Sequence, residues 1–205
     1  MPRKSILLFA AACLIAAAAL AVATVVIVTG RDGPAPASAE TGQPTVGGAF
    51  QLVDQNGRAV DESLLQGKWS AVFFGFTWCP DYCPTTLQTL DQAQQRLGDQ
   101  ADDLQIVFIS VDPERDTPEA LRDYLASDGF PEGVIGLTGE ADRIEAAARA
   151  YRAFYERVPQ GDTYTMNHSL TVYLMNPQGM FVQPLSAEQG PERLAELIRG
   201  AMAAG

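Results

Sequence analysis

The stretch Phe74-Gly75-Phe76-Thr77-Trp78-Cys79-Pro80-Asp81-Tyr82-Cys83-Pro84 decides the fold. The apolar run 69–74 that leads into it is typical of a buried strand, and a helical pattern over about 84–97 follows. Cys79 and Cys83 therefore lie at a strand-to-helix junction, where free amide groups and the helix dipole favour the thiolate form. Thiolate is the form that binds metal or attacks a disulfide, and the i, i+4 spacing puts both side chains on one face of a helical turn.

The rest of the domain alternates short apolar runs with helical patterns. Asn56-Gly57 predicts an early hairpin, followed by a short helical turn, and Thr117-Pro118 predicts a capped helix start. Residues 156–167 are polar and predict a loop. The remaining expected elements are strands at 104–111, 134–137, 169–175 and 180–184 and helices at 118–127, 140–154 and 191–202. This order predicts an α/β domain with a mixed β-sheet flanked by helices.

The N-terminus carries a second strong pattern. Residues 6–28 contain no charge and follow Arg3 and Lys4; as a helix they would extend roughly 34 Å, enough to cross a bilayer. We expect a membrane anchor over 1–29, a flexible linker over 30–46 and a folded domain over 47–205. The positive-inside rule places the domain outside the cytoplasm, which in a bacterium means a single-pass inner-membrane protein facing the periplasm. Cleavage after Ala37-Ser38-Ala39 is the alternative.

Charge limits the partners. Of the 14 basic residues 12 lie beyond the apolar run, with all 25 acidic ones, which leaves that part at −13 (12 − 25). Such a surface repels nucleic acid, and no nucleic-acid partner is expected. We interpret the excess of acidic residues mainly as a source of solubility and, to a lesser degree, as a charge that steers the protein toward a basic partner.

Few residues can carry chemistry. Cys13 falls in the expected anchor, where we interpret it as an inert packing residue. Cys79 and Cys83 are therefore the cysteines of the domain, and His168 is the only histidine of the protein. The cysteines could form a structural disulfide, although so short a loop would constrain the unfolded chain little. A lone histidine is by itself more often structural than a ligand.

Three segments together resemble the Sco/SenC family, thioredoxin-like copper proteins that serve cytochrome oxidase assembly. They are the FTWCPDYCP stretch at 76–84, the VDPERDTP stretch at 111–118, and Asn167-His168 ahead of 169–174. The resemblance covers roughly residues 44–204. It implies a thioredoxin-like fold, although thioredoxins place two residues between their cysteines and this chain places three. It also implies that Cys79, Cys83 and His168 bind one copper, as Cu(I) and as Cu(II).

The resemblance implies a membrane-anchored copper chaperone. Its partner would be cytochrome c oxidase subunit II, whose dinuclear copper site it would load, and another periplasmic copper carrier is a further candidate partner. One alternative is a thiol–disulfide reductase with Cys79 attacking and Cys83 as the second catalytic cysteine; another is a peroxidase or redox sensor. Whether the protein is an enzyme stays open. Zinc would need a carboxylate as a fourth ligand.

Several neighbouring residues have two interpretations each. Trp78 and Tyr82 could shield a metal or cover the domain surface, Asp81 could tune the thiolates or solvate the loop, and Met166 could lie near the metal or pack in the core. Asp112, Arg115 and Asp116 could brace the cysteine loop or only start a helix. Asn167 departs from the family, many members of which carry Asp there; Asn keeps the shape and loses the charge.

Overall fold

The computed structural model describes residues 46–204, so the expected anchor and nearly all of the expected linker lie outside the described part. The strands are β1 Gln51–Asp54, β2 Ala59–Asp61, β3 Trp69–Gly75, β4 Leu104–Ser110, β5 Ile135–Thr138, β6 Tyr155–Gln160, β7 Thr163–His168, β8 Val172–Met175 and β9 Phe181–Leu185. The α-helices are α2 Tyr82–Arg96, α3 Pro118–Leu125, α4 Ala141–Tyr151 and α5 Pro191–Ala204. Short 3₁₀ turns are η1 Glu62–Leu65, η2 Gly98–Asp103 and η3 Ala187–Gln189.

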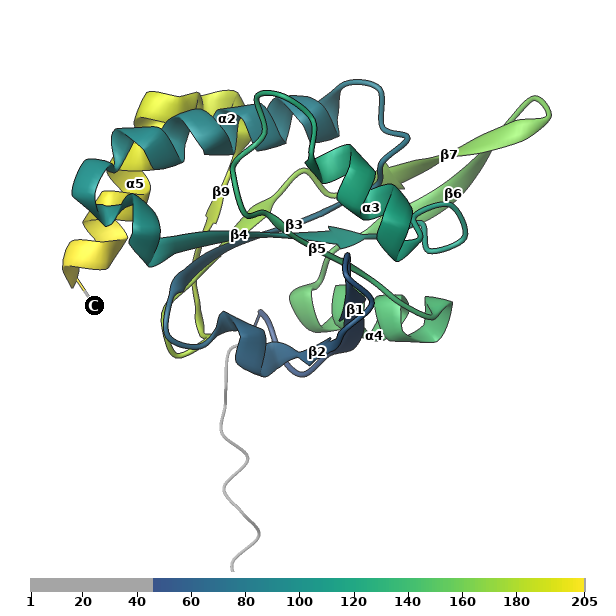
Figure 1. Cartoon of the computed structure of the whole chain (residues 1–205), viewed down its shortest axis with the longest axis horizontal. Helices are drawn as coiled ribbons and strands as arrows, with labels where there is room; N and C mark the ends of the chain where they lie inside the picture. Colours follow the sequence, from purple (N-terminus) through teal and green to yellow (C-terminus); the bar gives the residue numbers. More distant parts are fainter. Residues whose placement is uncertain (1–45, 205) are drawn as a thin grey trace, which may run out of the picture. The chain divides into compact units, whose positions relative to one another are not determined.

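Seven strands form one mixed sheet in the order β2-β1-β5-β4-β3-β8-β9. The central pairs β3–β4 and β4–β5 are parallel, and β1–β2, β1–β5, β3–β8 and β8–β9 are antiparallel. Helices α2 and α5 pack together on one face of the sheet, and α4 covers the opposite face (Figure 1). The predicted mixed sheet flanked by helices is therefore confirmed.

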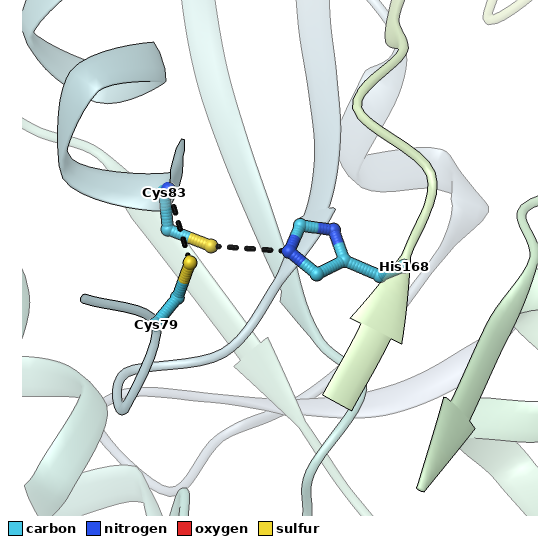
Figure 2. A group of neighbouring side chains, drawn as sticks. All are labelled: Cys79, Cys83 and His168. Atoms are coloured by element: carbon cyan, nitrogen blue, oxygen red, sulfur yellow. Dashed lines mark hydrogen bonds between the residues drawn. The ribbon is translucent and has the colours of Figure 1, made fainter. Parts of the chain in front are cut away.

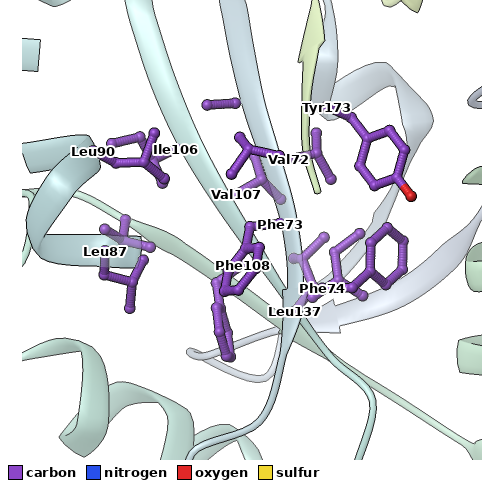
Figure 3. Close-up of a cluster of buried hydrophobic side chains, with 14 of the residues drawn as sticks. Val72, Phe73, Phe74, Leu87, Leu90, Ile106, Val107, Phe108, Leu137 and Tyr173 are labelled. Atoms are coloured by element: carbon purple, nitrogen blue, oxygen red, sulfur yellow. The ribbon is translucent and has the colours of Figure 1, made fainter. Parts of the chain in front are cut away.

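Strand β3 is the centre of the core, and all seven of its residues are buried. A central strand that is covered on both faces has a continuous run of apolar residues, and this run is what predicted β3 from the sequence. Its side chains alternate between the two faces. Phe73 lies against Phe108, with ring centroids 6.0 Å apart (Figure 3). The ring centroid of Phe74 lies 5.4 Å from that of Tyr151 in α4. Because β3 is packed on both faces, its last residue, Gly75, is a fixed starting point for the loop that carries Cys79.

The prediction of a polar loop at 156–167 is wrong. Strands β6 and β7 pair there as a separate two-stranded antiparallel sheet, which we call the ribbon (residues 155–168), and Figure 1 shows it reaching away from the main sheet. Most of its side chains are at least partly exposed, and β6 lacks the apolar alternation that marks a half-buried strand. In β7, Tyr164 and Met166 do alternate with polar residues, but the run is short. The two residues that join the strands, Gly161 and Asp162, are a recognised hairpin signal that the reading by polarity passed over.

Other differences are at element ends. Helix α4 ends at Tyr151, not near residue 154, because Arg152 adopts a left-handed conformation with φ of 56° and Ala153 N–H returns to the Ala148 carbonyl. Strand β8 begins three residues later than expected. The Asn56-Gly57 hairpin and the Thr117 cap are confirmed, since β1 pairs with β2 and the Thr117 hydroxyl accepts from Ala120 N–H. Within residues 46–204, every helix is too short or too polar to span a bilayer.

Candidate metal centre

The structure brings the three predicted site residues together from three separate segments. Cys79 lies in the cysteine loop (residues 76–81) that follows β3, Cys83 lies in the first turn of α2, and His168 is the last residue of β7. Their sulfur and ring-nitrogen atoms all lie within 4.8 Å of one another, and Cys83 Sγ is 3.5 Å from His168 Nε2 (Figure 2). One metal ion could contact all three, and their role as its ligands stays a prediction.

Cys79 is held by the start of helix α2. The Cys83 N–H donates to Cys79 Sγ at 3.4 Å, whereas the residue at the N-cap position, Asp81, makes no side-chain cap bond. A hydrogen bond with the Cys83 side chain lowers the pKa of Cys79 most, and the N–H groups of Cys83 and Asp81 lower it further; these effects outweigh burial and bring the pKa to about 4. Cys79 is therefore a thiolate at neutral pH.

The pKa of Cys83 shifts in the opposite direction from that of Cys79. It is fully buried, and burial followed by the neighbouring Cys79 sulfur raises the pKa of its thiol well above the usual range. The pair consequently rests as one thiolate and one thiol, and both cysteines are free in the described structure.

This asymmetry predicts how alkylation depends on pH. Because the pKa of Cys79 is lowered to about 4, its thiolate should persist down to mildly acidic pH and be lost only as pH falls through that value. The rate of iodoacetamide modification of the metal-free protein should therefore be nearly flat from about pH 8 to pH 5, whereas an ordinary thiol loses reactivity below about 8.5. Peptide mapping should find the label on Cys79. Cys79→Ser should remove this pH-independent modification. A modification rate that rises steeply as the pH increases through 8 would contradict the assignment of the thiolate to Cys79.

His168 has a defined tautomer and a confined ring. Its Nδ1 lies 3.0 Å from the Ser169 carbonyl oxygen, which can only accept, so Nδ1 carries the proton and the Nε2 lone pair faces the cysteines. The ring also packs in edge-on contact with Phe73 and Phe76, at centroid distances of 5.9 and 5.7 Å. A hydrogen bond from the distal nitrogen to a carbonyl is the usual way in which a metal-binding imidazole is oriented.

The cysteine loop is held in place by the segment that begins at Ser110, the last residue of β4, and that we call the brace (residues 110–117). Asp116, fully buried, accepts from Thr77 N–H at 3.0 Å, from the Thr77 hydroxyl at 2.6 Å and from the Ser110 hydroxyl at 2.6 Å. Burial raises the pKa of Asp116, and these donors oppose that rise. The expected bracing role is therefore confirmed for Asp116, whose contacts connect the loop to the central strands.

Gly75 is a site residue that the sequence reading missed. A Cβ atom placed there would lie 2.7 Å from Cys83 Sγ and 2.7 Å from the Phe108 ring, closer than side chains approach. The thiol therefore occupies space that only glycine leaves open at the end of β3. A glycine inside a buried strand pattern, next to the cysteine loop, is the signal that could have identified this close approach.

The structure decides between the two interpretations for some of the neighbouring residues. Trp78 and Tyr82 are 67% and 54% exposed, so most of their surface faces solvent. Met166 is buried in the core cluster, whereas Asp81 and Asn167 are exposed. The structure therefore supports the packing interpretation of Met166 and the solvating interpretation of Asp81.

The donor set suits a soft metal ion. Two sulfurs and one imidazole nitrogen match Cu(I), for which three ligands suffice. A structural zinc site normally has four protein ligands, and residues 46–204 contain no further Cys or His. The fit rests on geometry, because the sulfur atoms of Cys79 and Cys83 and a ring nitrogen of His168 all lie within 4.8 Å of one another.

Comparison with known proteins gives consistent matches. The SCO1/SenC family model matches residues 38–203. The mitochondrial SCO1 homolog 1 of Arabidopsis thaliana is 39% identical over 75% of this chain, and the match spans 44% of that longer protein. The structure of Bradyrhizobium japonicum ScoI with copper bound is 42% identical and covers 76% of this chain and 98% of its own, with a TM-score of 0.69. BsSco, described as a member of the Sco family of cytochrome c oxidase assembly proteins with a disulfide switch, is 26% identical over 78% of this chain and 94% of its own, with a TM-score of 0.62.

Proposed function

The chain belongs to the SCO1/SenC family, and on that premise we propose that it is a copper chaperone for cytochrome c oxidase. The observation that carries the proposal is the convergence of Cys79, Cys83 and His168 at one point of a fold whose relative ScoI holds copper. The protein binds copper, one ion per chain, and we assign these three residues as its ligands. Loading the full-length protein with copper and measuring metal per chain tests this proposal; stoichiometric zinc with no preference for copper would reject it.

The residues have unequal roles in accepting the ion. Cys79 already presents a thiolate, and the lone pair of His168 Nε2 is free of a proton. Cys83 has to lose its proton when the ion binds, so copper uptake releases about one proton at neutral pH. When bound, copper would be the cargo, transferred by exchange of these ligands for thiolates of the recipient.

The recipient that we propose is the dinuclear copper site of cytochrome c oxidase subunit II. Support comes from the family, because the relative BsSco is described as belonging to the cytochrome c oxidase assembly proteins. Trp78 and Tyr82, both largely exposed, flank Cys79 along the chain and offer apolar surface beside the ligands for contact with that partner.

A second candidate function is reduction of a disulfide in the same recipient. The observation that favours it is the asymmetric pair of Cys79 thiolate and Cys83 thiol. Cys79 would attack one sulfur of the partner disulfide and displace the other as a thiolate. Cys83 would then attack the Cys79 sulfur, and its proton would pass to the departing partner sulfur. The balance is two electrons from the cysteine pair, which ends as a disulfide, and two reduced partner cysteines.

We also propose that the chain is anchored through residues 1–29 with its domain in the periplasm. The support is the uncharged run behind Arg3 and Lys4, which lies outside the described residues. The protein should remain in the membrane pellet after carbonate extraction and be degraded by protease added to spheroplasts. A mature N-terminus at Glu40 would instead establish a cleaved, secreted form.

A further inference from the structure

Tyr164 of β7 is clamped between two arginines. The guanidinium carbon of Arg115 lies 3.8 Å from the centroid of the Tyr164 ring, and that of Arg157 lies 3.6 Å from it. Arg157 belongs to the ribbon itself and pairs with exposed Glu114 of the brace, a solvent-exposed ion pair of a kind that stabilises little. Arg115 belongs to the brace and is largely buried. Of the two arginines, Arg115 is therefore the one that reaches the ribbon from the brace through buried contacts.

Arg115 makes this connection through several contacts. Its Nη1 donates to the Tyr164 carbonyl at 3.1 Å, and its Nε forms an ion pair with Asp112, which also accepts from the Tyr164 hydroxyl at 2.8 Å. On the side of the cysteine loop, its guanidinium carbon lies 5.4 Å from the centroid of a Trp78 ring and 5.9 Å from that of Phe76. The side chain is only 17% exposed. One guanidinium thus contacts both the ribbon and the loop that carries Cys79.

The ribbon needs such an attachment. It is a two-stranded sheet that forms no ladder with the seven-stranded sheet, and an isolated hairpin is at best marginally stable in water. The bonds at its base, from Ser169 N–H to the Phe154 carbonyl and from Phe154 N–H to the Ser169 hydroxyl, join its two ends to each other rather than to the cysteine loop. His168 ends the same strand four residues after Tyr164, so the position of its imidazole depends on how the ribbon is held.

We propose that Arg115 is a positioning residue for His168: through Tyr164 it fixes the ribbon against the cysteine loop before any metal arrives, so that the third ligand is already in place. This inference rests on the proposed copper function. A ligand that is in place only part of the time weakens the apparent affinity by the fraction of time that it is in place. The contact should therefore raise copper affinity without Arg115 touching the metal.

The alternative is that Arg115 acts only as a positive charge near the thiolates. Two variants of Tyr164 separate the two ideas, because neither changes the charge of Arg115. Tyr164→Ala removes the ring that Arg115 stacks on, and Tyr164→Phe keeps the ring and removes only the hydroxyl bond to Asp112. Positioning predicts that Tyr164→Ala resembles Arg115→Ala and that Tyr164→Phe resembles the wild type; a charge effect predicts that only the Arg115 variant changes.

The first measurement uses the metal-free, full-length protein. Hydrogen–deuterium exchange of peptides covering residues 155–168 should become about tenfold faster in Arg115→Ala and Tyr164→Ala, since the ribbon then loses its buried attachment to the brace and opens more often. Exchange of β3 and β4 should not change. Arg96→Ala is the matched control, because it removes an exposed arginine that lies at the far end of α2 and pairs with Glu192 of α5. Wild-type protection of the ribbon in both variants would overturn the proposal.

The second measurement is Cu(I) affinity by competition with a chromogenic chelator. Arg115→Ala and Tyr164→Ala should bind about tenfold more weakly, within the roughly 10–100-fold range for lost contacts that orient a metal ligand. Arg115→Lys should recover only part of the loss, because an ammonium can keep the ion pair with Asp112 but not the planar stacking on Tyr164. Faster exchange with unchanged affinity would overturn the proposal. If the wild type itself binds no copper, the proposed function fails, while the exchange result still decides whether Arg115 holds the ribbon.

Discussion

Replacing Cys83 by Ser should abolish tight Cu(I) binding. The substitution leaves a hydroxyl at a fully buried position, and an alcohol neither ionises at neutral pH nor provides the soft donor that Cu(I) prefers. If three ligands share a binding free energy of the size found for structural zinc sites, roughly 10–16 kcal/mol, the loss of one is worth on the order of 10³-fold in affinity. Competition with a chromogenic Cu(I) chelator measures the loss.

Cys79→Ser should have the same effect, since it removes the ligand that is already ionised. Cys13→Ser is the matched control: it is the same exchange at the remaining cysteine of the chain, within the expected anchor. We expect this control to bind like the wild type. Binding within tenfold of the wild type in Cys83→Ser would place the metal elsewhere.

His168→Ala separates the two candidate functions. It removes one proposed ligand and leaves both cysteines, together with the helix start that stabilises the Cys79 thiolate. A chaperone should lose assembly of the oxidase copper site, because two ligands hold copper poorly and do not fix the geometry for transfer. A reductase should keep most of its activity, because attack by the thiolate needs no metal ligand.

The test is complementation of a deletion strain grown with limiting copper, with oxidase activity in membranes as the readout. We expect His168→Ala and Cys79→Ser to fail alike, at less than about a tenth of wild-type activity, with added copper giving at most partial rescue of His168→Ala. Asn167→Ala is a matched control, because it changes the exposed neighbour of His168 on the ribbon. If His168→Ala supports wild-type activity while Cys79→Ser fails, the reductase function stands and the copper function does not.

The central fold could be predicted because its signals are local. A continuous apolar run identified β3, and the helical pattern after the cysteines identified α2, so the junction that carries Cys79 and Cys83 followed from the chain order. The ribbon was harder to find by the same rule, because β6 carries no apolar alternation and β7 carries only a short one, at Tyr164 and Met166. Its hairpin turn at Gly161 was the remaining signal, and it is a short one.

The site was predictable to a similar degree. The scarcity of cysteine and histidine made the three candidate ligands easy to find, and their convergence required only that the fold bring β7 to the end of β3. The supporting contacts were harder, because they join segments distant in sequence: Thr77 with Asp116, and Arg115 with Tyr164. No local pattern specifies such pairs. Gly75 was visible as a residue, but its reason, the space needed by Cys83 Sγ, exists only in three dimensions.

The most direct test of the central claim is X-ray absorption at the copper K-edge of the full-length protein loaded with one equivalent of Cu(I). A centre formed by Cys79, Cys83 and His168 predicts two sulfur scatterers and one nitrogen scatterer around a three-coordinate ion. In His168→Ala the nitrogen contribution should disappear while both sulfurs remain. A wild-type spectrum without sulfur scatterers, or an unchanged nitrogen contribution in His168→Ala, would contradict the assignment of the copper site.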